Sequence, residues 1–201
     1  MQRYAVYSIR NKTEDGLLYT RAFIVIKNGY GVITRFTRLQ EFAGVYENHT
    51  YKPLTANTEG KLYFIVAMLN YVLVDHGAEN GIRHVFDITK PMLEEFFDAY
   101  AMEKFPDGGH RGAERVERCI SCVTLFMYKM AWKYGGYMKI KRNELYVERM
   151  VFTRKGTQAK RKVPDFQATG IVDEDGVFRD MPTKVLEILI PMAFRYTPDV
   201  A

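Results

Sequence analysis

Cysteine is scarce in this sequence, with two residues among 201. Cys119 and Cys122 form a C-x-x-C, a spacing that suits a redox pair or half of a zinc site. The four histidines supply neither H-x-x-x-H spacing nor the rest of such a site; they are His49, His76, His84 and His110. The pair also lies inside a long helical pattern and not at a turn between a strand and a helix. We therefore expect two structural cysteines and no metal, redox centre or cofactor.

Long apolar runs are missing as well. The longest, Leu62 to Val74, is interrupted by Asn70 and falls short of the roughly 20 residues that cross a bilayer. Near the amino terminus, Arg3 and Tyr4 are not followed by the continuous apolar stretch and small-residue cleavage site of a signal peptide. These absences predict a cytoplasmic protein with a buried helix at 62–74 and no membrane partner.

The common motifs of active sites are also absent. The sequence has no P-loop, no G-x-G-x-x-G and no G-x-S-x-G. Glu94, Glu95 and Asp98 would place carboxylates on one side of a helix, as an acid pair requires, but a solvated helix face explains them better.

What the chain does have is ample core material and an uneven charge. Hydrophobic residues make up 47% and aromatic residues 14%, enough for a packed core. The net charge is +5, yet the segment 139–162 alone holds nine basic residues against Glu144 and Glu148, a net charge of +7. A basic segment on an otherwise balanced chain is typical of a protein that binds a polyanion, although a solvated surface or flexible linker gives the same pattern.

The first fifty residues have the pattern of a small sheet. Tyr4 to Ile9 alternates, and Thr20 to Lys27 is rich in β-branched and aromatic residues. Asn28 to Gly31 is a turn signal, after which Val32 to Phe36 can return antiparallel. We predict a β-meander of three strands that caps the rest of the chain.

From Asn57 the apolar period becomes helical. The first helix is expected to begin at Asn57 or Thr58 and to end at Gly77. A second begins after Thr89, with Pro91 in its first turn and an expected buried face of Leu93, Phe96, Phe97, Tyr100 and Ala101.

The third helix is expected from about Arg111 to Tyr134, where Gly135 and Gly136 end it. One stripe at three- and four-residue steps is apolar and predicts the core face: Val116, Ile120, Val123, Met127 and Met130. An adjacent stripe is mostly basic: Arg111, Arg115, Arg118, Cys122, Lys129 and Lys133. A helix of this kind suits a phosphate backbone while it packs on its own bundle, although solvation alone also accounts for the cations.

The predicted fold class is α+β, in four parts: a small β-sheet domain over 1–54, a helical domain over 55–136, a basic linker with short strands over 137–179 and a last helix over 180–201. Asp180 or Thr183 is expected to cap that last helix, and Asp173 to Gly176 to form a surface turn.

A helical bundle, a basic linker and then the segment Phe178-Arg179-Asp180-Met181-Pro182-Thr183-Lys184-Val185-Leu186-Glu187-Ile188-Leu189-Ile190 resemble the tyrosine recombinases of the phage-integrase family. The resemblance runs from about Asn57 to Ala201 and implies a SAM-like core-binding domain followed by the first segment of a catalytic domain. In that family the two domains clamp DNA from opposite sides. Tyr4 to Phe36 is similar to the three-stranded arm-binding domain that some integrases carry.

The family's chemistry needs an arginine soon after the first catalytic helix, a lysine on a hairpin, an H-x-x-R pair and a tyrosine nucleophile. The resemblance places the first arginine just beyond Ala201, and no histidine here is followed by arginine at the third position. We therefore expect no strand cleavage by this chain. We expect it to be either a truncated gene product or the front part of a larger protein.

The sequence thus predicts double-stranded DNA binding in integrase-type recombination, with other recombinase protomers as further partners. The expected DNA-binding residues are Arg111, Arg115, Arg118, Lys129, Lys133, Lys139, Lys141, Arg142, Arg154, Lys155, Lys160, Arg161 and Lys162. One alternative is a protein-interaction module that dimerises or binds a partner recombinase without DNA. Another is RNA binding by the amino-terminal sheet through Tyr7, Tyr19 or Phe23, for which burial in the core is the simpler explanation.

Overall fold

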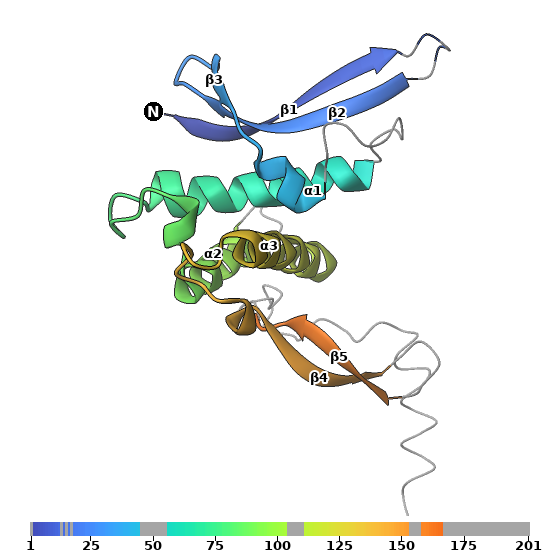
Figure 1. The fold of residues 1–201 in the computed structure, drawn as a ribbon, viewed down its shortest axis with the longest axis vertical. Helices are drawn as coiled ribbons and strands as arrows, with labels where there is room; N and C mark the ends of the chain where they lie inside the picture. The colour runs from blue at the N-terminus through green and yellow to red at the C-terminus, as the bar shows by residue number, and fades with distance from the viewer. Residues whose placement is uncertain are drawn as a thin grey trace, which may run out of the picture.

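The protein is described by a computed structural model that covers residues 2–12, 14, 16, 18–44, 56–103, 111–152 and 158–166. Its fold is α+β, as predicted: a three-stranded antiparallel sheet, three helices and a two-stranded hairpin (Figure 1). The main elements are β1 (Arg3–Lys12), β2 (Leu18–Lys27), β3 (Ile33–Phe36), α1 (Ala56–Leu69), α2 (Lys90–Met102), α3 (Ala113–Tyr134), β4 (Tyr146–Phe152) and β5 (Gln158–Pro164). The short turns of helix are η1 (Leu39–Ala43), η2 (Asn70–Asp75), η3 (Val85–Asp87) and η4 (Arg142–Glu144). The predicted turn at 173–176 and last helix at 180–201 lie outside the described residues.

The predicted meander is confirmed, with strand order β1-β2-β3. Asn28 builds the turn between β2 and β3, because its Oδ1 accepts hydrogen bonds from the backbone N–H groups of Tyr30 and Val32, both at 3.0 Å. Gly31 in this turn has a φ of 78°, a conformation that side chains with a Cβ rarely adopt.

The sheet is apolar on both faces. Ala22 and Ile24 of β2 belong to the main core, while Phe23 between them points to the other face. There its ring packs edge-on against Phe36 at 5.7 Å, and Tyr7 meets Phe36 at 5.9 Å. A buried Phe23 is a poor platform for a stacked base, whereas Tyr7 is 36% exposed, so RNA binding by the sheet stays an alternative.

The first predicted helix has two parts. The α-helix α1 begins at Ala56, so Asn57 and Thr58 lie inside its first turn and do not cap it as predicted. It ends at Leu69, and the π-helical turn η2 continues to Asp75. Gly77, at which the sequence predicted the end of the helix, comes two residues after Asp75. A Cβ at this position would lie 2.2 Å from the carbonyl oxygen of Leu73, so only glycine fits without a shift of the backbone.

The second and third helices follow the predictions closely. Thr89 precedes α2, Pro91 lies in its first turn, and the five predicted residues are its buried face. In α3 all five predicted core residues are buried, and Gly135 follows the last helical residue. The apolar period identified these helices because each has one well-defined face against the core.

One hydrophobic cluster runs from Ala22 and Ile24 of the sheet, through the helices, to Leu145 and Phe166 on either side of the hairpin. The ring of Phe166 packs on Phe97 of α2 at 5.1 Å, and Lys90 pairs with Asp165 at 2.7 Å. The basic segment of the sequence thus contains a hairpin whose two ends are anchored on the helices. The domain boundaries near 54 and 136 stay predictions.

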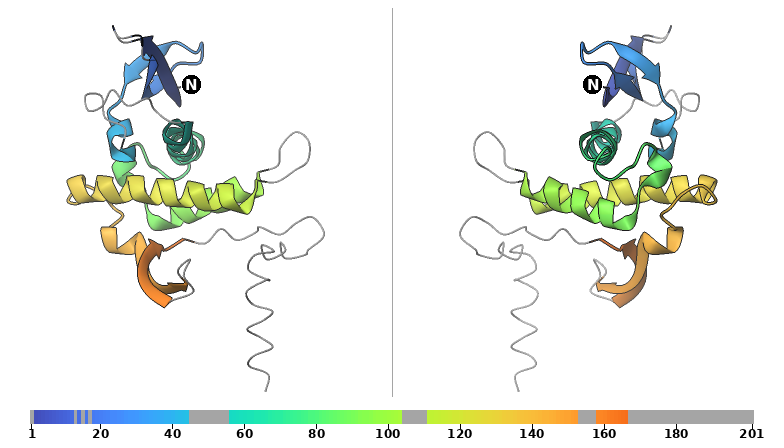
Figure 2. Two further views of the ribbon diagram at one scale, coloured as in Figure 1. Left: turned by 90° about the vertical axis from the view of Figure 1, so that its right-hand side faces the viewer. Right: turned by 90° about the vertical axis from the view of Figure 1, so that its left-hand side faces the viewer.

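The elements lie in successive layers, with the sheet on α1, α1 on α2 and α3, and the hairpin beyond them (Figure 1). Figure 2 shows α1 end-on while α3 lies across the view, so the two helices cross steeply. Within the described part of the chain, no helix is long and apolar enough to span a membrane.

Candidate nucleic-acid interface

One long side of α3 faces solvent. Arg118, Leu125 and Trp132 recur at seven-residue steps, which keeps them on the same side of a helix. Leu125 is 40% exposed, Trp132 is 71% exposed, and Arg118 is exposed too. We call these three residues the α3 ridge. The core residues of α3 lie on the opposite side, so the ridge is the part of the helix that a partner can reach.

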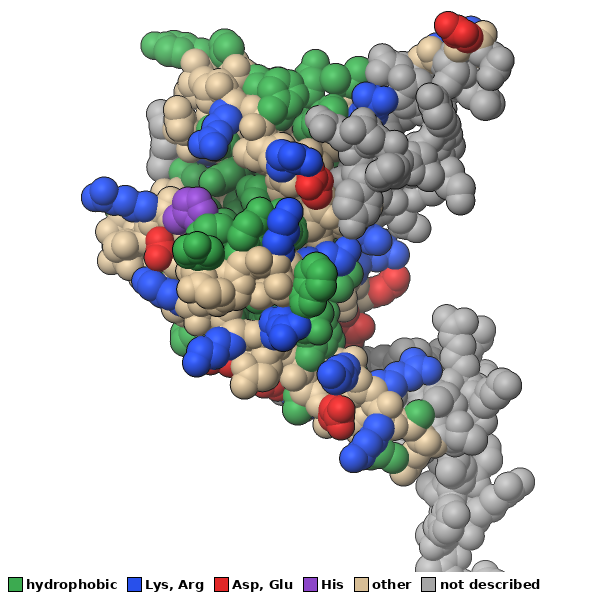
Figure 3. Space-filling view, viewed as in Figure 1, with side chains coloured by type: hydrophobic (Ala, Val, Ile, Leu, Met, Phe, Trp, Pro, Cys, Tyr) green, Lys and Arg blue, Asp and Glu red, His purple; other side chains and the backbone are tan. Residues whose placement is uncertain are grey.

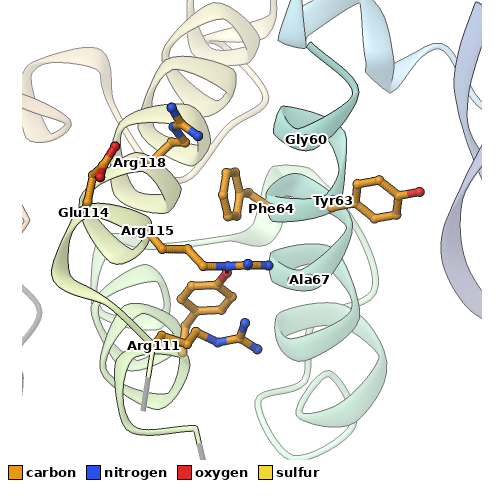
Figure 4. A pocket seen from close by; sticks show the side chains of 9 residues that line it. Gly60, Tyr63, Phe64, Ala67, Arg111, Glu114, Arg115 and Arg118 are labelled. Atoms are coloured by element: carbon orange, nitrogen blue, oxygen red, sulfur yellow. The ribbon is translucent and has the colours of Figure 1, made fainter. Parts of the chain in front are cut away.

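On one flank of the α3 ridge, α1 and α3 border a cavity of about 530 Å³, which we call the arginine pocket. Its lining includes Phe64 and Ala67 of α1, Tyr100 of α2, and Arg111, Arg115 and Arg118 at the start of α3. Figure 4 shows Arg115 reaching from α3 toward α1 and Phe64 pointing from α1 into the same space. The sequence predicted these three arginines, and the fold brings them to one cavity.

The three arginines have different surroundings. Arg111 has a side chain only 12% exposed, forms an ion pair with Glu103, and lies with its guanidinium 4.0 Å from the centre of the Tyr100 ring. The Nε of Arg115 donates a hydrogen bond to the Tyr100 hydroxyl at 3.4 Å. Arg115 and Arg118 have no ion pair with any carboxylate in the described ranges. The charge of Arg111 is therefore used within the protein, whereas the other two are available to a ligand.

On the other flank of the α3 ridge, α3 and the hairpin border a second cavity of about 890 Å³, which we call the hairpin pocket. Its lining includes Leu125 and Tyr128 of α3, Lys141 and Arg142 of η4, and Tyr146 and Lys162 of the hairpin. The rings of Tyr128 and Tyr146 meet edge-on at 5.4 Å. Burial, and next the neighbouring Tyr128, raise the pKa of Tyr146 above the usual value of a tyrosine. This pocket combines cations with an aromatic wall.

The hairpin separates three consecutive basic residues that the sequence grouped together. Glu148 faces Lys162, and Arg149 faces Arg161, across the two strands. Because opposite residues share a face and neighbours alternate, Lys160 and Lys162 lie on the face of the hairpin pocket, and Arg161 lies on the other face. Arg161 thus belongs to a surface different from that of its two neighbours.

Two further predicted lysines, at the end of α3, pack against η1. The Nζ of Lys129 lies beside Gly44, since a Cβ added at this glycine would be 3.5 Å from it. The Nζ of Lys133 lies 5.5 Å from the centre of the Phe42 ring, within range of a cation–π contact. Both continue the basic side of α3 beyond the arginine pocket.

Lys139 is not among the described residues that line either pocket. Lys139 pairs with Asp87 at 3.4 Å, next to η3. Arg154 and Lys155 lie outside the described residues.

Several side chains near the α3 ridge were not predicted from the sequence as parts of a binding site. Tyr100 was expected only as a core residue, and Tyr146 was not singled out. Lys61 of α1 is exposed and lies close enough to Cys122 to affect that thiol electrostatically. Only the packing of α1, α2 and the hairpin beside α3 brings these side chains to the α3 ridge. Figure 3 shows that cations also extend over the face seen there, from the sheet to the hairpin, with fewer acidic side chains scattered among them.

The two cysteines have the environment of core thiols. Burial raises the pKa of both Cys119 and Cys122, which keeps the thiols protonated at neutral pH. Both are free cysteines. Across the residues that the structure describes, no cluster of three or more histidine, cysteine or acidic side chains is arranged to hold a metal ion.

The comparisons with known proteins add no relative. The chain matches no protein-family model, no curated protein and no solved structure.

Proposed function

We propose that this chain binds double-stranded DNA through the α3 ridge and the two basic pockets beside it, as the non-catalytic front part of an integrase-type site-specific recombinase. The observation that carries the binding proposal is the position of cations on both flanks of one exposed helix, Arg115 and Arg118 on one side and Lys141, Arg142 and Lys162 on the other. The context of integration and recombination comes from the sequence resemblance alone.

The dimensions of α3 suit a duplex. A helix of 22 residues is about 33 Å long, close to one turn of B-form DNA. Cations distributed along such a helix can neutralise several phosphates, and each contact releases condensed counterions. We assign these residues to backbone contacts that position the protein, because arginine and lysine on helix flanks reach phosphates without reading bases. The proposal includes no strand cleavage.

A second candidate function is a protein-interaction module. It is favoured by the exposure of Leu125 and Trp132 on the α3 ridge, because large apolar side chains beside cations are common at protein interfaces. In this case a second copy of the chain or another recombinase protomer would cover the ridge.

Fluorescence anisotropy of the full chain with a labelled mixed-sequence duplex, at salt from about 50 to 200 mM, separates the two functions. Phosphate contacts predict affinity that falls steeply with salt, whereas an apolar protein interface does not. The double variant Arg115→Glu/Arg118→Glu should bind duplex at least about tenfold more weakly and reduce the salt slope by about 2, since two phosphate contacts are lost. Absence of duplex binding at the lowest salt would favour the protein-interaction module.

Arg161→Glu is the matched control for charge reversal, because Arg161 lies on the opposite face of the hairpin. It should leave duplex affinity within about twofold of wild type, because its side chain lies on the face away from the hairpin pocket and salt screens an exposed charge. Equal losses for Arg161→Glu and the double variant would indicate a general charge effect and would contradict the proposed face.

A further inference from the structure

We propose that the arginine pocket is a binding site for a phosphoryl group, held by the guanidinium group of Arg115 and the hydroxyl of Tyr100, with Arg118 as a second cation in the lining. This group belongs either to the backbone of a nucleic acid or to a free phosphorylated small molecule. In the first case the inference rests on the proposed DNA binding. In the second it stands independently.

Tyr100 carries the specific part of this inference. Its side chain is buried, with the residue 6% exposed, yet it lines the cavity. The hydroxyl oxygen accepts a hydrogen bond from Arg115 Nε, and a hydroxyl that accepts still has one proton to donate. Among the described residues, no acceptor for that proton is found. This proton faces the cavity, where an oxyanion could accept it.

Tyr100 also positions the side chains of Arg111 and Arg115. Arg111 stacks on it while the ion pair with Glu103 offsets the Arg111 charge. This leaves the hydroxyl at the edge of the ring to orient Arg115. Arg115 is thus already positioned before a ligand arrives, which lowers the entropy cost of binding.

The charge of the cavity favours an anion. Arg115 and Arg118 supply two cations, and the one carboxylate in the lining belongs to Glu114. In Figure 4 Arg115 crosses the cavity toward α1, whereas the side chains of Glu114 and Arg118 both point away from the space that Arg115 crosses. Planar guanidinium groups with several donors match the oxygens of a phosphoryl group in geometry as well as charge.

The size of the cavity indicates what carries the phosphoryl group. About 530 Å³ is within the usual range of small-molecule sites and is much larger than a phosphate ion needs. Phe64 and Ala67 of α1 form an apolar wall opposite the arginines. The space beside the proposed phosphoryl position therefore accommodates a sugar or another organic group attached to it.

The experiment compares the melting temperature of the full chain in inorganic phosphate and in chloride at equal ionic strength. Phosphate at about ten times its Kd should raise the Tm of the wild type by a few degrees. Tyr100→Phe keeps the ring and removes only the hydroxyl, and we expect it to weaken phosphate binding about tenfold. Arg115→Gln should do the same, whereas Arg161→Gln, on the other face of the hairpin, should retain the full phosphate shift.

Each variant is compared with its own Tm in chloride, so a change in basal stability does not affect the result. General stabilisation by phosphate as an excluded solute would raise the Tm of every variant equally. Equal phosphate shifts in the wild type, Tyr100→Phe and Arg115→Gln would overturn the proposal.

Duplex affinity of Tyr100→Phe distinguishes the two sources of the phosphoryl group. If the phosphate shift and duplex affinity both fall, the pocket holds a backbone phosphate. If the phosphate shift falls and duplex affinity is unchanged, the pocket holds a free phosphorylated molecule. If the wild type binds no duplex but shows the phosphate shift, the proposed DNA binding fails while the phosphoryl site stands.

Discussion

The side-chain amide of Asn70 bonds to both main-chain polar groups of Tyr4. The Tyr4 N–H donates to Asn70 Oδ1 at 2.8 Å, and Asn70 Nδ2 donates to the Tyr4 carbonyl at 2.9 Å. Tyr4 lies in β1, which is an edge strand, so this amide takes the place of a neighbouring strand. It fastens the sheet to the junction of α1 and η2.

Replacement of Asn70 should loosen the sheet from the helices. Asn70→Ala removes two hydrogen bonds in a partly buried position, and we expect the free energy of unfolding to fall by about 1–3 kcal/mol. Urea denaturation followed by circular dichroism measures this change. Asn143→Ala is the matched control, because Asn143 is exposed and should cost less than about 0.5 kcal/mol. Equal losses in the two variants would show that the Asn70–Tyr4 hydrogen bonds add no more to the free energy of unfolding than an exposed side chain does.

The single tryptophan of the chain provides a direct optical test of the proposed interface. Trp132 is 71% exposed on the α3 ridge, and no other tryptophan contributes to the fluorescence. Addition of duplex DNA should change its intensity or shift its emission to shorter wavelength, and raising salt to about 200 mM should reverse the change. Binding by anisotropy with no response from Trp132 would place the DNA away from the ridge.

The alternation of the hairpin predicts different roles for adjacent cations. Lys162→Gln should lower duplex affinity and reduce the salt slope by about 1, because Lys162 lines the hairpin pocket. Arg161→Gln removes the same charge from the opposite face and should leave the slope unchanged. Salt titrations of the two variants make the comparison. A larger effect of Arg161→Gln would mean that DNA meets the other face of the hairpin.

Alkaline pH should destabilise the fold. Burial raises the folded-state pKa of five weak acids: Tyr4, Tyr71, Cys119, Cys122 and Tyr146. Their stabilising contribution is fully present below the unfolded pKa values, about 8.5 for cysteine and 10 for tyrosine. Above those values the unfolded chain releases protons that the folded chain retains. The free energy of unfolding should therefore fall as pH rises from the unfolded pKa of each group toward its raised folded pKa.

Urea denaturation in reducing buffer between about pH 7.5 and 10.5 measures that loss, which reaches at most about 1.4 kcal/mol per pH unit for each group. Cys119→Ala removes the most strongly shifted of the two thiols and should flatten the dependence above about pH 9. An identical slope in the variant and the wild type would contradict a role for Cys119 in this linkage.

The local features of this protein were predictable from its sequence. Asn28 and Gly31 specify the turn of the meander, because the amide side chain and the positive φ are local requirements. The five core residues of α3 recur at helical spacing, and that period identifies a buried face without knowledge of what covers it. The gathering of basic residues on α3 and in the segment that follows was visible in the same way.

The sequence showed Asn70 only as an interruption of an apolar run, and it presented Lys160, Arg161 and Lys162 as one cluster. The partner of Asn70 is Tyr4, 66 residues away, and strand pairing sends Arg161 to a different face from its neighbours. Contacts between residues far apart in the sequence produce no periodic pattern, because they depend on how the helices and strands pack and pair.

The sequence by itself therefore determined the meander, the three helices, the buried faces of α2 and α3 and the excess of cations after α3, since all of these follow from spacing and composition. Only the tertiary structure decided that Arg115 and Arg118 share a cavity with the Tyr100 hydroxyl while Arg111 is held by Glu103. The physical reason is that a binding site depends on which side chains face one another across packed elements. That juxtaposition arises when α1, α2 and α3 bury their apolar faces together.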